Sequence, residues 1–224
     1  KVLTTNCSTF KDVEFLDISS PSGLRTYTRS LFFVLYKAVR DTYGSEARLR
    51  IDTPVSNGYY CRLTLPGGKG VDQSVVEALK QRMQQIVKDD LPFHRITCPT
   101  EQAIARFRQD GLESKAKLLE GIGKLYTTYY TLDDTADYFY GSLLIKTSQI
   151  YLFDIMLFAD GLFLRIPDPN NPSQLKPMVE QPKMFEVFNE QHRWNEILGV
   201  TTVGEFNDAC SRGYTNQLIN VSEA

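Results

Sequence analysis

The chain has 224 residues and 42% of them are hydrophobic, which is enough for one sizeable core or one core with a small appendage. Its net charge of −2 gives no basic excess for neutralising a run of phosphates, so composition does not support extended nucleic-acid binding, although a local basic groove stays open. Four scattered cysteines without a CxxC pair, no signal peptide and no apolar stretch of membrane length predict a reduced, cytoplasmic protein that does not enter a membrane.

The first predicted elements are a short strand at 13–16 and a long helix at 24–43. Apolar residues recur along the helix at helical spacing and spread beyond one face, so we expect it to be largely buried. Three cations, Arg25, Arg29 and Lys37, are placed on one side of it by their spacing. They form either a solvated edge or a row that faces an anion.

The middle of the chain alternates predicted strands and helices. Strands are expected at 49–53 and 59–65 around an Asn57-Gly58 turn, at 93–98 and at 126–132, and helices at 73–88, 100–110 and 112–119. His94 and Cys98 share one face of a strand, but zinc needs about four ligands and no other histidine or cysteine lies nearby in sequence. We therefore interpret both as ordinary strand residues.

The stretch 137–167 organises the rest of the chain. It begins with the aromatic-glycine motif YFYG at 138–141 and continues into apolar runs at 150–158 and 162–166. An Asp160-Gly161 pair between the runs predicts a hairpin. The first run is apolar on both faces apart from Asp154, so we expect a central, covered strand.

An acidic cluster precedes the aromatic-glycine motif. Asp133, Asp134 and Asp137 are either carboxylates that cap a turn or the rim of a binding site. In the second case Tyr138 and Tyr140 would offer flat faces to a base or a sugar.

The C-terminal part is predicted to be helical. Composition predicts a loop at 168–173 and an amphipathic helix at 183–198 with Phe185, Phe188 and Ile197 directed inward. A capping-box pattern at 202–205 begins a last helix that should stop near Gly213. We therefore divide the chain into a domain at 1–182 and a helical appendage or linker at 183–224.

The order of these motifs resembles the second additional domain of threonyl- and alanyl-tRNA synthetases, the editing-type fold. That family carries HSxxH on a buried helix and DLCRGPHxxxTG before apolar strands. Here the corresponding stretches are RSLFF at 29–33, DYFYGSL at 137–143 and KTS at 146–148, with NGYY at 57–60 between them. The resemblance implies an α+β fold, in which a buried helix packs against an antiparallel sheet.

The family's metal ligands are replaced in this chain. By the resemblance they fall on Arg29, Phe33, Phe139 and Leu143, none of which binds zinc. The resemblance thus implies a metal-free version of the domain. Asp137 falls on a carboxylate that the family links to editing.

A second resemblance is to a bacterial nucleoside-kinase-like family, often labelled uridine kinase, in which this domain precedes a P-loop kinase domain. The pattern RxYxRSLxFxLxxA is matched at 25–38, with YFYG at 138–141, GLFLRIP at 161–167 and WNEILGV at 194–200. By analogy the kinase domain would follow Ala224, and ATP and magnesium would belong there, so no cofactor is expected in this chain.

We therefore predict a non-catalytic region that binds a ligand and influences a downstream kinase. The ligand is a nucleoside, a nucleotide, an amino acid-like molecule or an RNA end. The predicted pocket residues are Arg25, Arg29, Tyr59, Asp137, Tyr138, Tyr140, Lys146 and Arg165. Arginines would pair with phosphate or carboxylate, and tyrosines would stack on a base.

Two other functions stay open from the sequence. One is a metal-independent hydrolase that acts on mischarged tRNA, with Asp137 positioning water. The other is a structural module for docking or for self-association into a homo-oligomer.

Overall fold

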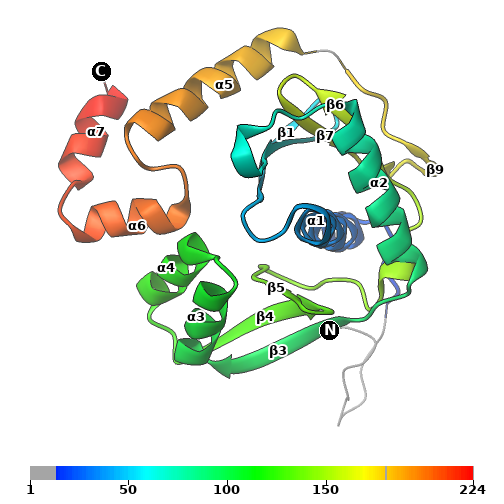
Figure 1. The fold of residues 1–224 in the computed structure, drawn as a ribbon, viewed down its shortest axis with the longest axis horizontal. Coiled ribbons are helices and arrows are strands. Elements are labelled where there is room, and N and C mark those ends of the chain that lie inside the picture. The colour runs from blue at the N-terminus through cyan, green and yellow to red at the C-terminus, as the bar shows by residue number, and fades with distance from the viewer. Residues whose placement is uncertain (1–13, 180, 224) are drawn as a thin grey trace. The chain divides into compact units, whose positions relative to one another are not determined.

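A computed structural model describes residues 14–179 and 181–223, and Figure 1 shows their elements. The chain forms two compact units that are discontinuous in sequence. The first contains the described residues of Lys1–His94, Thr131–Thr135 and Phe139–Glu180. The second contains Arg95–Tyr130, Ala136–Tyr138 and the described residues of Gln181–Ala224.

The first unit is built around helix α1 (Pro21–Tyr43), which Figure 1 shows end-on. The helix begins where Ser20 Oγ accepts from the backbone N–H of Gly23 at 3.1 Å, and Pro21 supplies a preset φ in the first turn. Leu31, Phe33 and several neighbours are 0% exposed, so the prediction of a largely buried helix is confirmed. The strand expected at 13–16 is wrong for residues 14–16, which are irregular, and Val13 lies outside the described residues.

The first unit also contains a four-stranded antiparallel sheet. It consists of β1 (Arg48–Val55), β2 (Gly58–Thr64), β6 (Asp154–Phe158) and β7 (Gly161–Arg165), in the order β1-β2-β7-β6. Both predicted hairpins are present. The first apolar run is not central, because β2 pairs with β7 and leaves β6 at the edge. Its residues 150–153 lie outside the strand, so the expected central strand is corrected to a short edge strand.

Helix α2 (Gln73–Lys88) completes the framework of the first unit, and its bounds agree with the prediction. Asp72 caps its first turn by accepting from the backbone N–H of Val75 at 3.0 Å. Short 3₁₀ turns occur at η1 (Pro66–Gly68) and η2 (Thr147–Gln149). The loop expected at 168–173 is wrong, since β8 (Pro167–Asp168) and β9 (Asn171–Leu175) pair as a small hairpin. Its turn residues resemble a loop by composition, because turn and loop use the same amino acids.

The second unit contains most of a three-stranded sheet, two helices that pack on it and the C-terminal helices. The strands β3 (Phe93–Pro99), β4 (Tyr126–Leu132) and β5 (Thr135–Asp137) are ordered β3-β4-β5. Helices α3 (Thr100–Gln109) and α4 (Glu113–Ile122) enclose a core that contains Ala103, Phe107, Ala116, Leu119, Tyr129 and Ala136. Strand β5 was not predicted, because three residues are too few for a periodic pattern.

The C-terminal helical appendage contains α5 (Pro182–Ile197), α6 (Val203–Ser211) and α7 (Thr215–Glu223). The Thr202 capping box is confirmed. None of the residues of α5, all of which the structure describes, is buried, and Ile197 is 75% exposed, so the predicted inward face is wrong. Helix α7 was not expected beyond Gly213. The division at 182/183 stays a prediction.

Among the described residues, no helix combines the length and apolar character that a bilayer crossing requires. Cys61, Cys98 and Cys210 form no disulfide among the described residues, and Cys7 lies outside them.

Candidate functional site

One face of α1 carries Arg25, Arg29 and Phe32, which follow one another at four- and three-residue intervals. Residues at this spacing lie one above the other on a helix surface. Arg25 is exposed, and its Nη2 donates to Ser22 Oγ at 3.3 Å, which holds the guanidinium beside the first turn. This face is therefore basic at its N-terminal end.

Arg29 contacts the aromatic-glycine loop. Its Nη1 donates to the carbonyl of Ser142 at 3.3 Å. Gly141 has a φ of 106°, and a Cβ there would lie 2.7 Å from Arg29 Nη1, so only glycine permits this approach. Tyr140, directly before this glycine, is 65% exposed. A guanidinium and an accessible aromatic ring are thus brought to one place.

The neighbouring turn of α1 fixes the same loop from the other side. Ser30 Oγ accepts from the backbone N–H of Leu144 at 2.8 Å. Because Ser30 is fully buried, this hydrogen bond is shielded from water and holds the loop firmly against the helix.

The four positions on which the family's metal ligands fall by the resemblance also come from this helix and this loop. The rings of Phe33 and Phe139 have centroids 5.2 Å apart, and Leu143 is 2% exposed. Arg29, the fourth, is the residue that touches the loop at Ser142. A guanidinium and three apolar side chains do not fit zinc, whose ligands are thiolate, imidazole or carboxylate. Within residues 14–179 and 181–223, no group of three or more such side chains is placed to hold a metal ion.

Tyr59 joins the arginine-bearing face through Phe32. The two rings meet edge to face, with centroids 4.8 Å apart. Burial raises the pKa of the Tyr59 hydroxyl, so it stays neutral at physiological pH. We call the surface formed by Arg25, Arg29, Tyr59 and Tyr140 the α1 arginine face.

Lys146 and Arg165 lie elsewhere in the first unit, each beside a carboxylate. Lys146 Nζ is 2.6 Å from Asp90 Oδ2, and its hydrogen bond, together with one from Ser148, lowers the pKa of Asp90. Arg165 Nη1 is 3.8 Å from Asp154 Oδ2. These pairings tie loops and strands together, and a ligand role for either cation stays a prediction.

Asp137 and Tyr138 belong to the second unit. The Asp137 side chain is 7% exposed, and its Oδ1 accepts from Lys115 Nζ and from the backbone N–H of Tyr138. Tyr138 packs against the core that contains Phe107. Their role in ligand binding also stays a prediction.

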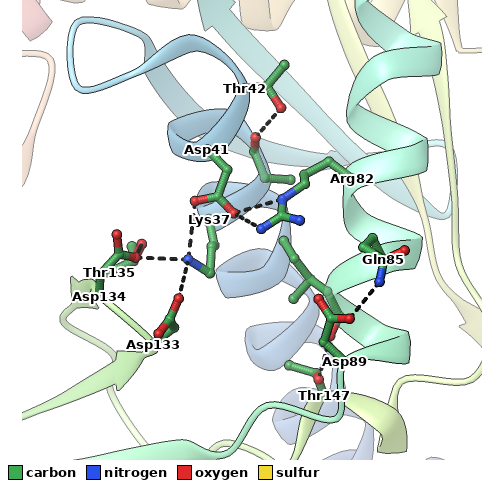
Figure 2. Close-up of polar contacts among 12 residues, drawn as sticks. Lys37, Asp41, Thr42, Arg82, Gln85, Asp89, Asp133, Asp134, Thr135 and Thr147 are labelled. Atoms are coloured by element: carbon green, nitrogen blue, oxygen red, sulfur yellow. Dashed lines mark hydrogen bonds and ion pairs between the residues drawn. The ribbon is translucent and has the colours of Figure 1, made fainter.

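Lys37 does not continue the row of Arg25 and Arg29. Its side chain is 2% exposed, and Nζ lies 2.9 Å from Asp134, 3.2 Å from Asp41 and 3.4 Å from Asp133, as Figure 2 shows. Arg82 binds the other oxygen of Asp41 at 2.7 Å. The expected three-cation row is therefore wrong at Lys37, because twelve residues along the helix rotate its side chain by about 120° around the axis from Arg25.

The ion pairs of Lys37 account for two residues of the acidic cluster, Asp133 and Asp134. Burial alone would lower the pKa of Lys37, but the hydrogen bonds and charges of Asp134 and Asp41 outweigh it and raise the pKa. Lys37 in turn lowers the pKa of Asp134. Asp133 and Asp134 thus act as turn carboxylates that bind a buried lysine. Sequence reasoning missed this ion pair, because the partners are about a hundred residues apart.

The chain is similar to curated threonine–tRNA ligases. It is 29% identical over 158 residues to that of Syntrophotalea carbinolica, covering 70% of this chain and 24% of the relative. For the Nitrosococcus oceani ligase the identity is 29% over 150 residues, covering 66% and 22%. For the Acidithiobacillus ferrooxidans ligase it is 31% over 111 residues, covering 50% and 17%. No family model matches the chain.

The chain therefore contains a threonyl-tRNA synthetase-like domain with an α+β, editing-like fold, which confirms the fold prediction. It spans between 17% and 24% of the length of these relatives. Each of them is a synthetase, so the predicted kinase parent gains no support from the comparison.

Proposed function

We propose that the first unit is a metal-free, editing-type binding domain that holds an RNA 3′ end on the α1 arginine face. The observation that carries this proposal is the close approach of Arg29 to Gly141 and Ser142, which places a guanidinium against the loop that carries the exposed Tyr140. Guanidinium groups bind phosphates through paired hydrogen bonds, and exposed tyrosine rings stack on bases. The names of the relatives, which are tRNA ligases, support RNA as the ligand.

The test compares two equally exposed tyrosines. Tyr140 and Tyr126 are both 65% exposed, and Tyr126 belongs to the second unit. Binding of a fluorescein-labelled RNA ending in CCA is followed by anisotropy. Stacking is worth about 1–3 kcal/mol per base, so Tyr140→Ser should weaken binding by about fivefold or more. Tyr126→Ser should leave the affinity unchanged, and equal effects of both variants would refute the proposal.

Arg25→Ala checks the phosphate contribution separately. Arg25 is exposed and contacts only its own first turn among the described residues, so its removal should not disturb folding. Loss of one phosphate contact should reduce the salt dependence of binding by about one unit of slope. An unchanged slope would place the RNA backbone elsewhere.

A second candidate function is metal-independent deacylation, and one observation favours it. Both hydrogen bonds to Asp137 fall on Oδ1, which leaves Oδ2 as the oxygen that can accept from water. Deacylation of mischarged tRNA should then persist in EDTA and be lost in Asp137→Asn. Activity that EDTA abolishes, or that Asp137→Asn retains, would exclude this mechanism.

A regulatory role toward a nucleoside kinase rests on the sequence patterns alone. It requires that uridine phosphorylation by a protein containing this domain changes when the α1 arginine face is altered. An activity that Arg29→Ala leaves unchanged would remove this proposal.

A further inference from the structure

A pocket of about 540 Å³ lies within the second unit, lined by residues of α4, α6 and α7 and of the turn before α6. Its walls are held by close packing. A Cβ on Gly204, in the first turn of α6, would lie 2.5 Å from the carbonyl oxygen of Ser114 in α4. Only a glycine lets the two helices approach this closely, so the pocket has a defined shape. Its volume is in the range typical of small-molecule sites.

One wall of the pocket offers carboxylate oxygens. Glu205 Oε2 accepts from Thr201 N and Thr201 Oγ1 at 2.8 Å and from Thr202 N at 3.0 Å. Asp208 Oδ2 is 3.0 Å from Arg212 Nη2. In the described part of the chain, no donor reaches Glu205 Oε1 or Asp208 Oδ1. Each carboxylate is thus fixed by one oxygen and presents the other.

Glu205 remains ionised in this setting. Burial would raise the pKa of its carboxyl group, but the hydrogen bonds from Thr201 and Thr202 prevail and lower it. The Glu205 carboxylate therefore keeps its negative charge at physiological pH.

Two cations line the pocket as well, Arg212, which is the partner of Asp208, and Lys117. Lys117 on α4 is half-buried, and none of the described residues lies within hydrogen-bond or ion-pair distance of its ammonium group. A cation without a protein partner is available to pair with an incoming carboxylate. The rest of the lining includes the polar side chain of Gln217 and an apolar part formed by Leu198, Val200, Leu218 and the half-exposed ring of Tyr214.

This arrangement selects for a ligand that carries both charges. A phosphate would meet Lys117 and Arg212 but also two carboxylates, and a polyamine would meet the two carboxylates but also the two cations. We propose that the pocket binds a free apolar α-amino acid. Its carboxylate pairs with Lys117, its ammonium donates to Glu205 and Asp208, and its side chain packs on the leucines, the valine and Tyr214. This site is separate from the α1 arginine face and does not depend on the function proposed for that face.

The experiment titrates the full chain with L-phenylalanine and L-leucine and follows backbone amide shifts by NMR. Saturable shifts are expected at Lys117, Glu205, Asp208 and Tyr214. N-acetyl-L-phenylalanine amide, which lacks both charges, should produce none. No saturable shift at about 10 mM amino acid, enough to fill a site with a Kd of about 1 mM, would overturn the proposal. Saturation by inorganic phosphate or by spermidine in place of the amino acids would also overturn it.

A substitution and a ligand analogue test the same contact independently. Lys117→Met keeps the apolar stem and should weaken binding at least tenfold, whereas Lys124→Met, at an exposed lysine beyond α4, should not change it. L-phenylalaninol lacks the carboxylate and should bind the unaltered protein at least tenfold more weakly than L-phenylalanine. Equal affinity for phenylalanine and phenylalaninol refutes the Lys117 pairing even if Lys117→Met fails to fold. RNA binding should be unaffected by Lys117→Met.

Discussion

Two cations on the same helix have opposite environments. Arg25 is exposed on the α1 arginine face, whereas Lys37, three turns further on, has a side chain that is 2% exposed among three carboxylates. The difference shows that position around the helix axis, and not the charge itself, decides whether a cation stabilises the fold or stays available to a ligand. The two environments should therefore respond differently to substitution.

The largest effect is expected from Lys37→Ala. The substitution removes a buried four-carbon stem and leaves Asp41, Asp133 and Asp134 without their shared cation. By analogy with large-to-small changes in cores, the free energy of unfolding should fall by about 3 kcal/mol. Urea denaturation measures this loss.

Lys37→Met is the matched control for packing. It fills the same space, the side chains of Asp133 and Asp134 are largely exposed to water, and Asp41 keeps Arg82. We expect a loss of about 1 kcal/mol. Equal losses for the alanine and methionine variants would show that charge, and not the buried stem, dominates at this position.

An intermediate effect is expected from Gly141→Ala, which tests the α1 arginine face. A φ of 106° is unfavourable for alanine, and the added Cβ displaces the Arg29 guanidinium. The stability loss should be about 1–3 kcal/mol, and RNA binding should weaken.

Gly44→Ala provides the comparison for this variant. Gly44 has a φ of 79°, and nothing lies within 4 Å of the position where a Cβ would be. The Gly44→Ala variant should lose a similar free energy of unfolding through backbone strain, and it should retain RNA binding. If both variants bind RNA equally well, the contact between Arg29 and the loop has no role in binding.

The smallest effect concerns the pH dependence of the Lys37 network. Lys37 lowers the pKa of Asp134 below its usual 3.8, so the folded chain releases this proton more readily than the unfolded chain. The stabilisation is then present above about pH 4 and is lost as the pH falls through the lowered pKa. The raised pKa of Lys37 preserves its charge up to at least the ordinary value of 10.5.

Asp134→Asn measures this contribution. The Asp134 side chain is 79% exposed, so the difference from the unaltered protein at pH 7 should be only about 0.5 kcal/mol. Urea denaturation at pH 3 should show a smaller difference. A difference that does not change between the two pH values would exclude the ion pair as its source.

Local patterns predicted the long elements well. The helix at 73–88 and the strand at 126–132 agree with α2 and β4 residue for residue, because caps and periodicity act within a few neighbours. Strand order was predicted poorly. The run at 150–158 was expected to be central, but centrality depends on β2, about a hundred residues earlier. The β8–β9 hairpin was missed because its composition is that of a loop.

The candidate site was predicted in part. Spacing on the helix identified Arg25 and Arg29, and the YFYG motif identified Tyr140, which the structure brings beside Arg29 through Gly141. The charge pairs could not be predicted, since Lys146 with Asp90 and Lys115 with Asp137 join separate segments. No sequence motif marks the pocket of the second unit, because its lining residues come from several helices and from the turns between them.

The order in which α1 acquires its partners has a consequence for biosynthesis. The hydroxyl group of Tyr27 on this helix donates to the carbonyl of Leu152, which lies 125 residues later in the chain. The backbone N–H of Leu152 donates to the same hydroxyl oxygen. At ribosomal rates the interval between the two segments is roughly 6 to 25 s. For that time a largely buried helix of the chain is complete, while the segment that supplies Leu144 and Leu152 to it has not been made. Nascent chains should therefore depend on chaperones until β7 emerges from the exit tunnel.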